Sequence, residues 1–172
     1  MGVFNLIVTH LPGYYERREA LDELRWILDS IDVVERYNNV LLLWVPRPRE
    51  AVERLRRKLP EGTPVLRVIP VDRVTGLGVS EVREAVHELL SRAGPGSFAV
   101  RIDGHLVDEE GRLMHRVDSA RVIAEGVERP VNLKSPEVLV YVKVVGRPGR
   151  RRAAIYVGPP RGILSLARER GA

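Results

Sequence analysis

The sequence contains no cysteine among its 172 residues. Without cysteine the chain has no disulfide framework, no thiolate ligand for a zinc ion and no cysteine nucleophile. It also lacks an apolar run long enough to cross a bilayer, and its first residues lack the basic region and long apolar stretch of a secretory signal. These absences lead us to expect a cytoplasmic protein.

Lysine and aromatic residues are scarce as well. Lys58, Lys134 and Lys143 are the only lysines, so 25 of the 28 basic residues are arginine, whose planar fork suits phosphate. The same bias also follows from genome composition, and a high charge content without cysteine is compatible with a thermophile. Aromatic residues make up only 5% of the chain, which argues against a broad base-stacking platform and favours contacts with a nucleic-acid backbone.

Positive charge is concentrated near the carboxyl end. Residues 1–96 hold 14 basic and 14 acidic residues, residues 97–172 hold 14 and 9, and residues 129–172 alone hold 10 and 2. A solvated surface usually mixes both signs, so this separation predicts a polyanionic partner.

The densest basic stretch lies between two apolar segments, Val138–Val145 and Ala153–Val157, which read as paired strands. Two glycines and a proline between them predict a turn. The arginines of this segment are Arg147, Arg150, Arg151 and Arg152. Crowded like charges are unfavourable unless solvent or an anion screens them, so phosphate contact is favoured over a mobile loop without a partner.

Hydrophobic periodicity in the first part of the chain predicts an α+β unit. The expected elements are strands over residues 4–11, 33–37, 40–45 and 65–71 and helices over residues 15–30 and 49–59. Their order is the βαββαβ pattern of a ferredoxin-like domain. A third helix, capped by Ser80, is expected to end at Arg92. We therefore place a domain at residues 1–94, with a linker over residues 93–97.

The remaining residues, 95–172, predict a second domain. A strand over residues 97–103 is followed by a charged, irregular segment and then by a helix capped by Asp118 or Ser119. The basic hairpin comes next, and a short helix from Ile163 is expected to close the chain.

One stretch of this second domain carries a family pattern. Residues 131–136, VNLKSP, lead directly into the long apolar strand, and a strand and a helix precede them. This V-[DN]-L-x-[NS]-P arrangement resembles the THUMP domain, an α/β module of enzymes and accessory proteins that modify tRNA. Asn132 stands where that family more often has Asp, and Ser135 where it more often has Asn. The resemblance covers about residues 95–172 and implies a surface that grips the acceptor stem and 3′ end of tRNA.

The resemblance further implies a role without chemistry of its own. Stand-alone THUMP proteins present tRNA to a separate RNA acetyltransferase that makes acetylcytidine. We therefore expect a tRNA-binding accessory protein without catalytic residues, cofactor or metal. Its expected RNA-binding residues are Arg101, Arg116, Lys134, Lys143, Arg147, Arg150, Arg151, Arg152, Arg161 and Arg168.

Two alternatives remain open. The ferredoxin-like sheet is compatible with a protein-interaction scaffold that binds RNA incidentally. A small enzyme would have to use Asp103, Asp108 or His105, although these acids lack the spacing of a calcium loop and read as a solvated acidic turn.

Other chemical motifs are incomplete. The Gly76-Leu77-Gly78 stretch lacks the third glycine of a dinucleotide fingerprint, because Glu81 stands there. His10 is expected to be a structural or edge residue and His87 a solvated or half-buried side chain, whereas His105 and His115 either stack on a base or occupy ordinary loop positions.

The remaining basic and aromatic positions favour structural interpretations. On the helix over residues 49–59, the pairs Glu50–Arg54 and Glu53–Arg57 predict a solvated face joined by ion pairs. Tyr141 and Tyr156 are expected in the core or across strands rather than on bases.

Overall fold

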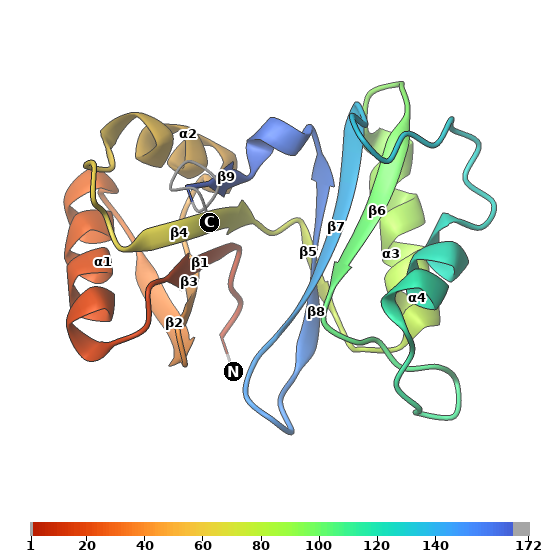
Figure 1. Ribbon diagram of the computed structural model, residues 1–172, viewed down its shortest axis with the longest axis horizontal. Helices are drawn as coiled ribbons and strands as arrows, with labels where there is room; N and C mark the ends of the chain where they lie inside the picture. Colours follow the sequence, from red (N-terminus) through yellow and green to blue (C-terminus); the bar gives the residue numbers. More distant parts are fainter. Residues whose placement is uncertain (1, 167–172) are drawn as a thin grey trace. The chain divides into compact units, whose positions relative to one another are not determined.

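The computed structural model describes residues 2–166 (Figure 1) and divides the chain into two compact units. The first unit comprises the chain up to Val71 together with the segment that begins at Arg161, and the second comprises Asp72–Pro160. The chain therefore enters the second unit once and returns to the first.

The first unit is a helix-covered antiparallel sheet. Its elements are β1 (Leu6–His10), α1 (Tyr14–Ile27), β2 (Asp32–Tyr37), β3 (Val40–Trp44), α2 (Pro48–Lys58), β4 (Val65–Pro70) and β9 (Leu164–Ser165). The strand order β2-β3-β1-β4-β9 places β1 and β3 side by side in the middle. This is the ferredoxin-like βαββαβ arrangement that the sequence predicts, extended by β9.

Local chemistry explains these elements. Asn38 has a φ of 44°, and asparagine tolerates this conformation in the short β2–β3 turn. Pro48 is the first residue of α2, where its missing N–H costs no helical hydrogen bond. Alternate strand residues such as Leu41 and Leu43 pack with Leu24 of α1 and Leu55 of α2, so both helices share one core with the sheet.

The second unit is a four-stranded sheet with two helices. Its elements are β5 (Arg73–Thr75), α3 (Val79–Arg92), β6 (Phe98–Asp103), α4 (Arg116–Ala124), β7 (Val138–Val145) and β8 (Arg152–Gly158), and the short 3₁₀ turn η1 (Pro160–Gly162) follows. The strand order is β5-β8-β7-β6, with β6 and β7 parallel and the other pairs antiparallel. The expected fold class, an α+β chain with a ferredoxin-like unit followed by an α/β unit, is confirmed.

The division into units differs from the boundary at residues 94 and 95 that separates the expected domains 1–94 and 95–172. Helix α3 belongs to the second unit, because Val82 and Val86 pack in one apolar core with Phe98 of β6 and Ile123 of α4. The segment over residues 93–97, expected to link domains, instead joins α3 to β6 inside the second unit.

Both predicted helix caps are wrong. Helix α3 begins at Val79, and its first N–H donates to the carbonyl of Val107 (2.9 Å), so it does not use Ser80 as a cap. Helix α4 begins at Arg116, ahead of Asp118, and Ser119 lies buried inside it. A contact with a residue distant in sequence satisfies the first N–H of α3, and neither helix has a side-chain hydrogen bond at its N-cap, so a local capping pattern does not locate either start.

The prediction that a closing helix begins at Ile163 is also wrong. Leu164 and Ser165 form β9, which pairs with Val68 and Arg67 of β4. Leu164 is buried in the core of the first unit. Burial of this leucine and hydrogen bonding to β4 outweigh the weak helical pattern of the sequence.

Candidate nucleic-acid interface

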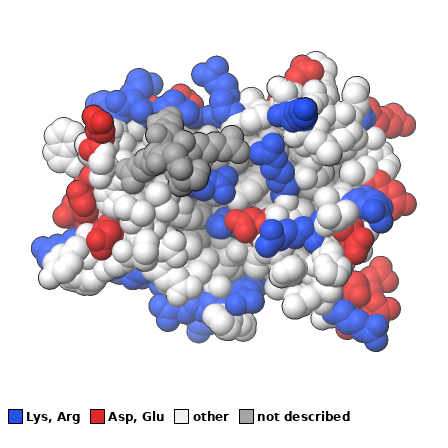
Figure 2. Space-filling view, viewed as in Figure 1, with Lys and Arg blue, Asp and Glu red and all other residues white. Residues whose placement is uncertain are grey.

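The turn between β7 and β8 presents arginine side chains to solvent. Arg147, Arg150 and Arg151 are all exposed on this six-residue connection, which we call the hairpin turn (residues 146–151). Figure 2 shows basic side chains gathered at the foot of the view, where this hairpin ends in Figure 1. Arg152 is the first residue of β8 and is half-buried. The structure therefore brings three of the four arginines onto one exposed turn.

Glycine shapes this turn. Gly146 has a φ of 109°, and a Cβ atom built on it would lie 2.7 Å from the carbonyl oxygen of Arg150. The Arg150 N–H in turn donates to the carbonyl of Arg147 at 2.9 Å. A side chain at Gly146 would push the backbone apart, so the glycine holds Arg147 and Arg150 close together.

Arg101 and Lys143 lie on the sheet face opposite the helices. Their neighbours in sequence, Val100 and Val142, pack in the helix-covered core, and successive strand residues point to opposite faces. The two basic residues differ in environment. Lys143 Nζ is 2.8 Å from Asp103 Oδ2, which also accepts a hydrogen bond from the Tyr141 hydroxyl at 3.1 Å.

Asp103 therefore compensates the charge of Lys143, and we do not count Lys143 among the cations that face a partner. Arg101 is exposed and makes no hydrogen bond or ion pair with another residue in the described range. Tyr141 lies directly opposite Tyr156, and both rings are buried, as expected for cross-strand residues.

The strand pairing brings a further arginine to the end of the sheet where the hairpin turn lies. Strands β6 and β7 run parallel, so residues 104–115, which follow β6, leave the sheet at the end where β7 meets the hairpin turn. Arg112 and Arg116 are exposed on this connection and at the start of α4. Arg116 is one of the expected RNA-binding residues, whereas Arg112 is not. The parallel order of the two strands, which an intervening helix favours, is the signal that would have located it.

This connecting segment also carries acids, so its surface is of mixed sign. Asp108 Oδ1 accepts the backbone N–H groups of Glu110 and Arg112, both at 2.9 Å, which makes it a turn-forming residue. No group of three His, Asp or Glu side chains suited to a metal ion occurs in the described part of the chain. The hairpin turn is thus the uniformly basic part of this end.

Two expected RNA-binding residues lie elsewhere, and a third is not among the described residues. Lys134 is exposed on the loop that precedes β7, at the opposite end of an eight-residue strand that spans on the order of 25 Å. Arg161 lies in η1, on the segment that belongs to the first unit. Arg168 lies outside the described residues. The ten expected positions therefore do not form one surface.

The VNLKSP motif forms a compact turn. Asn132 Oδ1 accepts the N–H groups of Lys134 (3.2 Å) and Ser135 (3.0 Å), which are the bonds an aspartate carboxylate would accept at this position. The Asn132 N–H donates to the carbonyl of Phe98 in β6 at 3.0 Å. This motif therefore anchors the start of β7 to β6.

Arg129 belongs to the basic stretch over residues 129–172 but is not a free cation. Its guanidinium donates hydrogen bonds to backbone carbonyls at the end of α3 and in the segment that follows. The acceptors are Leu90 (3.0 Å), Ala93 (3.4 Å), Gly94 (2.7 Å) and Gly96 (3.2 Å). These carbonyls include ones left without helical partners at the end of α3, so Arg129 stabilises the α3–β6 connection.

The histidines divide as expected into structural and exposed ones. His10 is fully buried, and its Nδ1 lies 2.7 Å from the Leu11 carbonyl. Burial lowers the pKa of His10 below 6.5, opposed in part by that hydrogen bond. His87 is half-buried against the Ile123 carbonyl at 2.9 Å. His105 and His115 are exposed, and their role stays a prediction.

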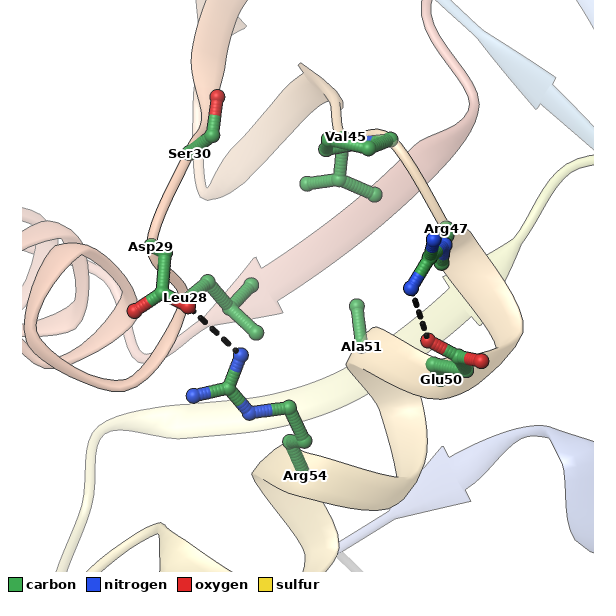
Figure 3. Close-up of a pocket in the computed structure, with 9 residues that line it drawn as sticks. Leu28, Asp29, Ser30, Val45, Arg47, Glu50, Ala51 and Arg54 are labelled. Carbon is green, nitrogen blue, oxygen red and sulfur yellow. Dashed lines mark hydrogen bonds and ion pairs between the residues drawn. The ribbon is translucent and has the colours of Figure 1, made fainter.

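The solvated face of α2 carries ion pairs, but with other partners than predicted. Arg47 pairs with Glu50 at 3.5 Å, and Arg54 reaches Asp29 at 3.4 Å rather than Glu50. Figure 3 shows both pairs at the edge of a pocket of about 230 Å³ between α2 and the end of α1. Each guanidinium in this pocket is bound by a carboxylate, so the pocket has no unsatisfied cation to offer a ligand.

No helix within residues 2–166 has the length and apolar character needed to cross a membrane. The sequence matches no protein-family model and no curated protein.

Solved structures do resemble the chain in fold. The first is PH1313 from Pyrococcus horikoshii Ot3, with a TM-score of 0.64 and 13% identity over 90% of this chain and 54% of that one. A 4-thiouridine synthetase in complex with RNA and bound ATP gives a TM-score of 0.53 and 15% identity over 91% of this chain and 42% of the other. TrmN from Thermus thermophilus gives 0.51 and 17% identity over 88% and 44%.

The chain thus spans about half the length of the solved proteins that it resembles. At these identities the likeness concerns the fold, and nearly the whole chain takes part in it. Nearly the whole chain therefore shares its fold with parts of larger proteins.

Proposed function

We propose that this protein binds tRNA and positions it for a separate modifying enzyme, an RNA cytidine acetyltransferase. The observation that carries the proposal is the hairpin turn, where Arg147, Arg150 and Arg151 are exposed together on a backbone shaped by glycine. Guanidinium groups bind phosphate through paired N–H donors, and the bond from the Arg150 N–H to the Arg147 carbonyl closes the turn that carries them. One of the structurally similar proteins was crystallised with RNA, which supports RNA as the polyanion.

If phosphate contacts dominate the interface, the affinity for tRNA should depend strongly on salt concentration. Binding that releases counterions from several phosphates should weaken about tenfold or more between roughly 50 and 200 mM salt. A titration of labelled tRNA at the two concentrations measures this change. Affinity that stays constant would mean that phosphates do not dominate the interface.

The hairpin turn is tested by neutralising two residues that make no hydrogen bond or ion pair through their side chains in the described part of the chain. Arg150→Gln with Arg151→Gln should lower tRNA affinity about tenfold and reduce the salt slope by about two. The matched control is Arg57→Gln with Lys58→Gln, which removes the same charge from the exposed end of α2. Equal weakening by both variants would show that only net charge matters and would remove the hairpin turn from the interface.

The accessory role needs a separate measurement. Adding this protein to an RNA cytidine acetyltransferase should raise the yield of acetylcytidine in tRNA, while this protein alone should produce none. Nucleoside analysis by mass spectrometry reads both outcomes. Binding to tRNA without any effect on the acetyltransferase would keep the RNA-binding part of the proposal and overturn the choice of partner.

A further inference from the structure

A second pocket of the first unit is built differently from the one in Figure 3. It has a volume of about 290 Å³ and lies between α1 and the edge strand β2. Its lining consists of Tyr14, Arg17, Arg18, Leu21, Asp22, Arg25 and Arg36. Most of these residues fall at spacings of three or four along α1, so they form one stripe on the helix. We call this set the arginine pocket.

Four guanidinium groups face one carboxylate in the arginine pocket. Arg18 and Arg25 are exposed, and neither makes a hydrogen bond or ion pair with another residue between positions 2 and 166. In the pocket of Figure 3, by contrast, Arg47 and Arg54 each contact a carboxylate. In the first unit, acids therefore neutralise the arginines of the pocket in Figure 3, whereas Arg18 and Arg25 of the arginine pocket stay exposed without such a partner. Such a cluster favours an anion, because like charges repel until a counterion arrives.

Local structure orients part of this cluster. Arg17 Nη2 donates to the carbonyl of Asn38, in the β2–β3 turn, which fixes one guanidinium beside the strand. Arg36 comes from β2 itself and faces the pocket from the other side. Guanidiniums held by two different elements can contact successive phosphates of a chain, which a single flexible side chain does not do.

An exposed aromatic ring completes the site. Tyr14 is 72% exposed at the start of α1, and its ring lies edge-to-face against that of Tyr15, with ring centroids 5.5 Å apart. The neighbouring ring restricts Tyr14, while most of the Tyr14 surface stays in solvent. A base stacks on such a face while its phosphate reaches a nearby arginine, and this combination distinguishes nucleic acid from an acidic peptide.

We propose that the arginine pocket is a second RNA-binding site, which takes an unpaired segment of RNA with its phosphates on the arginines and a base on Tyr14. This inference rests on the proposed function, because it makes the first unit part of the same tRNA interface. It assigns the hairpin turn to the backbone of folded RNA and the arginine pocket to an unpaired strand, the 3′ end of tRNA.

The test uses the full chain and compares intact tRNA with tRNA lacking its unpaired 3′ end. Arg18→Gln with Arg25→Gln should weaken intact tRNA about tenfold and reduce the salt slope by about two. The control Arg57→Gln with Lys58→Gln should leave affinity unchanged. Tyr14→Ala should weaken binding roughly fivefold to tenfold, whereas Tyr14→Phe, which keeps a flat ring, should bind as the native protein does. Thermal unfolding of each variant verifies that these exposed substitutions leave the fold intact.

Failure of this inference is distinguishable from failure of the proposed function. If the Arg150→Gln, Arg151→Gln variant weakens binding but the pocket variant matches the control, the arginine pocket is not an RNA site and the proposed function stands. If the native chain does not bind tRNA, both are overturned. If adenosine monophosphate alone occupies the pocket as tightly as RNA, the site serves a free nucleotide and the RNA assignment is overturned. Equal loss with intact and trimmed tRNA would overturn the assignment to the 3′ end.

Discussion

Arginine side chains in this molecule have environments that a count of charges does not distinguish. Arg129 is bound to four backbone carbonyls, Arg150 is exposed on a turn, and Arg54 is bound to an acid. Only the second kind can exchange solvent for phosphate without breaking an existing contact. At the residue scale, each guanidinium must therefore be assigned by its partners.

Arg129 should matter for stability rather than for RNA. We expect Arg129→Gln to lower the free energy of unfolding by about 2 kcal/mol, because the end of α3 loses charge-assisted hydrogen bonds. Urea denaturation measures this change, and tRNA affinity of the folded variant should stay close to that of the native protein. Arg151→Gln is the control and should alter stability by less than about 0.5 kcal/mol. Loss of RNA affinity without loss of stability in the Arg129 variant would contradict this assignment.

The burial of His10 predicts that the free energy of unfolding decreases at acidic pH. Its Nδ1–H donates to the Leu11 carbonyl, and its buried Nε2 has no hydrogen-bond partner among the described residues, so a proton there would carry charge into the core. Burial makes the pKa of His10 lower in the folded state than the ordinary 6.5. The unfolded chain therefore binds a proton more readily. The stabilisation is fully present above pH 6.5 and declines as the pH falls through 6.5 toward the lower folded-state value.

Urea unfolding of the native protein and of His10→Gln at several pH values tests this sign. The difference in unfolding free energy between the two proteins should shrink as the solution is acidified. The exposed Leu113, which has no titratable group, provides the control, because Leu113→Ala should leave the pH dependence unchanged. A native pH profile that matches that of His10→Gln throughout would exclude His10 as the titrating group.

At the scale of elements, the β7–β8 hairpin depends on one glycine. Gly146→Ala should destabilise the protein by about 1–3 kcal/mol, because a positive φ and a 2.7 Å approach to the Arg150 carbonyl both oppose a side chain. Affinity for tRNA should fall as well, since Arg150 would be displaced. Gly78→Ala is the matched control, because Gly78 has a φ of −63° and open space around its Cβ direction. Comparable effects of the two substitutions would mean that the turn is not under this constraint.

The elements also show which features a sequence can predict. Hydrophobic spacing locates α1 and α2, and the Asn38 turn and the Pro48 helix start follow from the chemistry of single residues. The start of α3 does not, because its first N–H is satisfied by Val107, a residue distant in sequence. Strand β5 is only three residues long and carries no periodic signal of its own.

In the candidate interface, too, some features follow from local sequence and others depend on contacts between distant segments. The exposed hairpin turn is visible in the sequence as a run of arginines between apolar strands. The contact of Lys143 with Asp103 depends on the register of β6 against β7, and the arginine pocket depends on α1 lying beside β2. Both arise from pairings between segments that local pattern does not encode. For this reason the sequence predicts the basic hairpin turn of the second unit but not the arginine pocket of the first.

At the scale of the whole molecule, the carboxyl-terminal segment contributes to the first unit. Leu164 of β9 is 2% exposed in the core that β1, β3 and β4 build with the helices. We expect Leu164→Ala to lower the free energy of unfolding by about 2–4 kcal/mol through lost burial and a residual cavity. Hydrogen exchange should show the loss of protection in β4 and β1 more than in β7 and β8. The exposed Leu113 gives the control, since Leu113→Ala removes a similar volume from the surface.

The path of the chain has a consequence for how the two units are held together. Because the chain leaves the first unit after Val71 and re-enters it at Arg161, two peptide connections join the units. A protease cut at the Arg161 crossing would leave the units joined by the peptide chain between Val71 and Asp72. A cut at the Val71 crossing would instead give two polypeptides, and the pairing of β9 with β4 and the burial of Leu164 would then hold the second polypeptide on the first unit without a covalent link. A nick at one crossing therefore leaves a covalent tether, whereas a nick at the other leaves a noncovalent complex of two fragments.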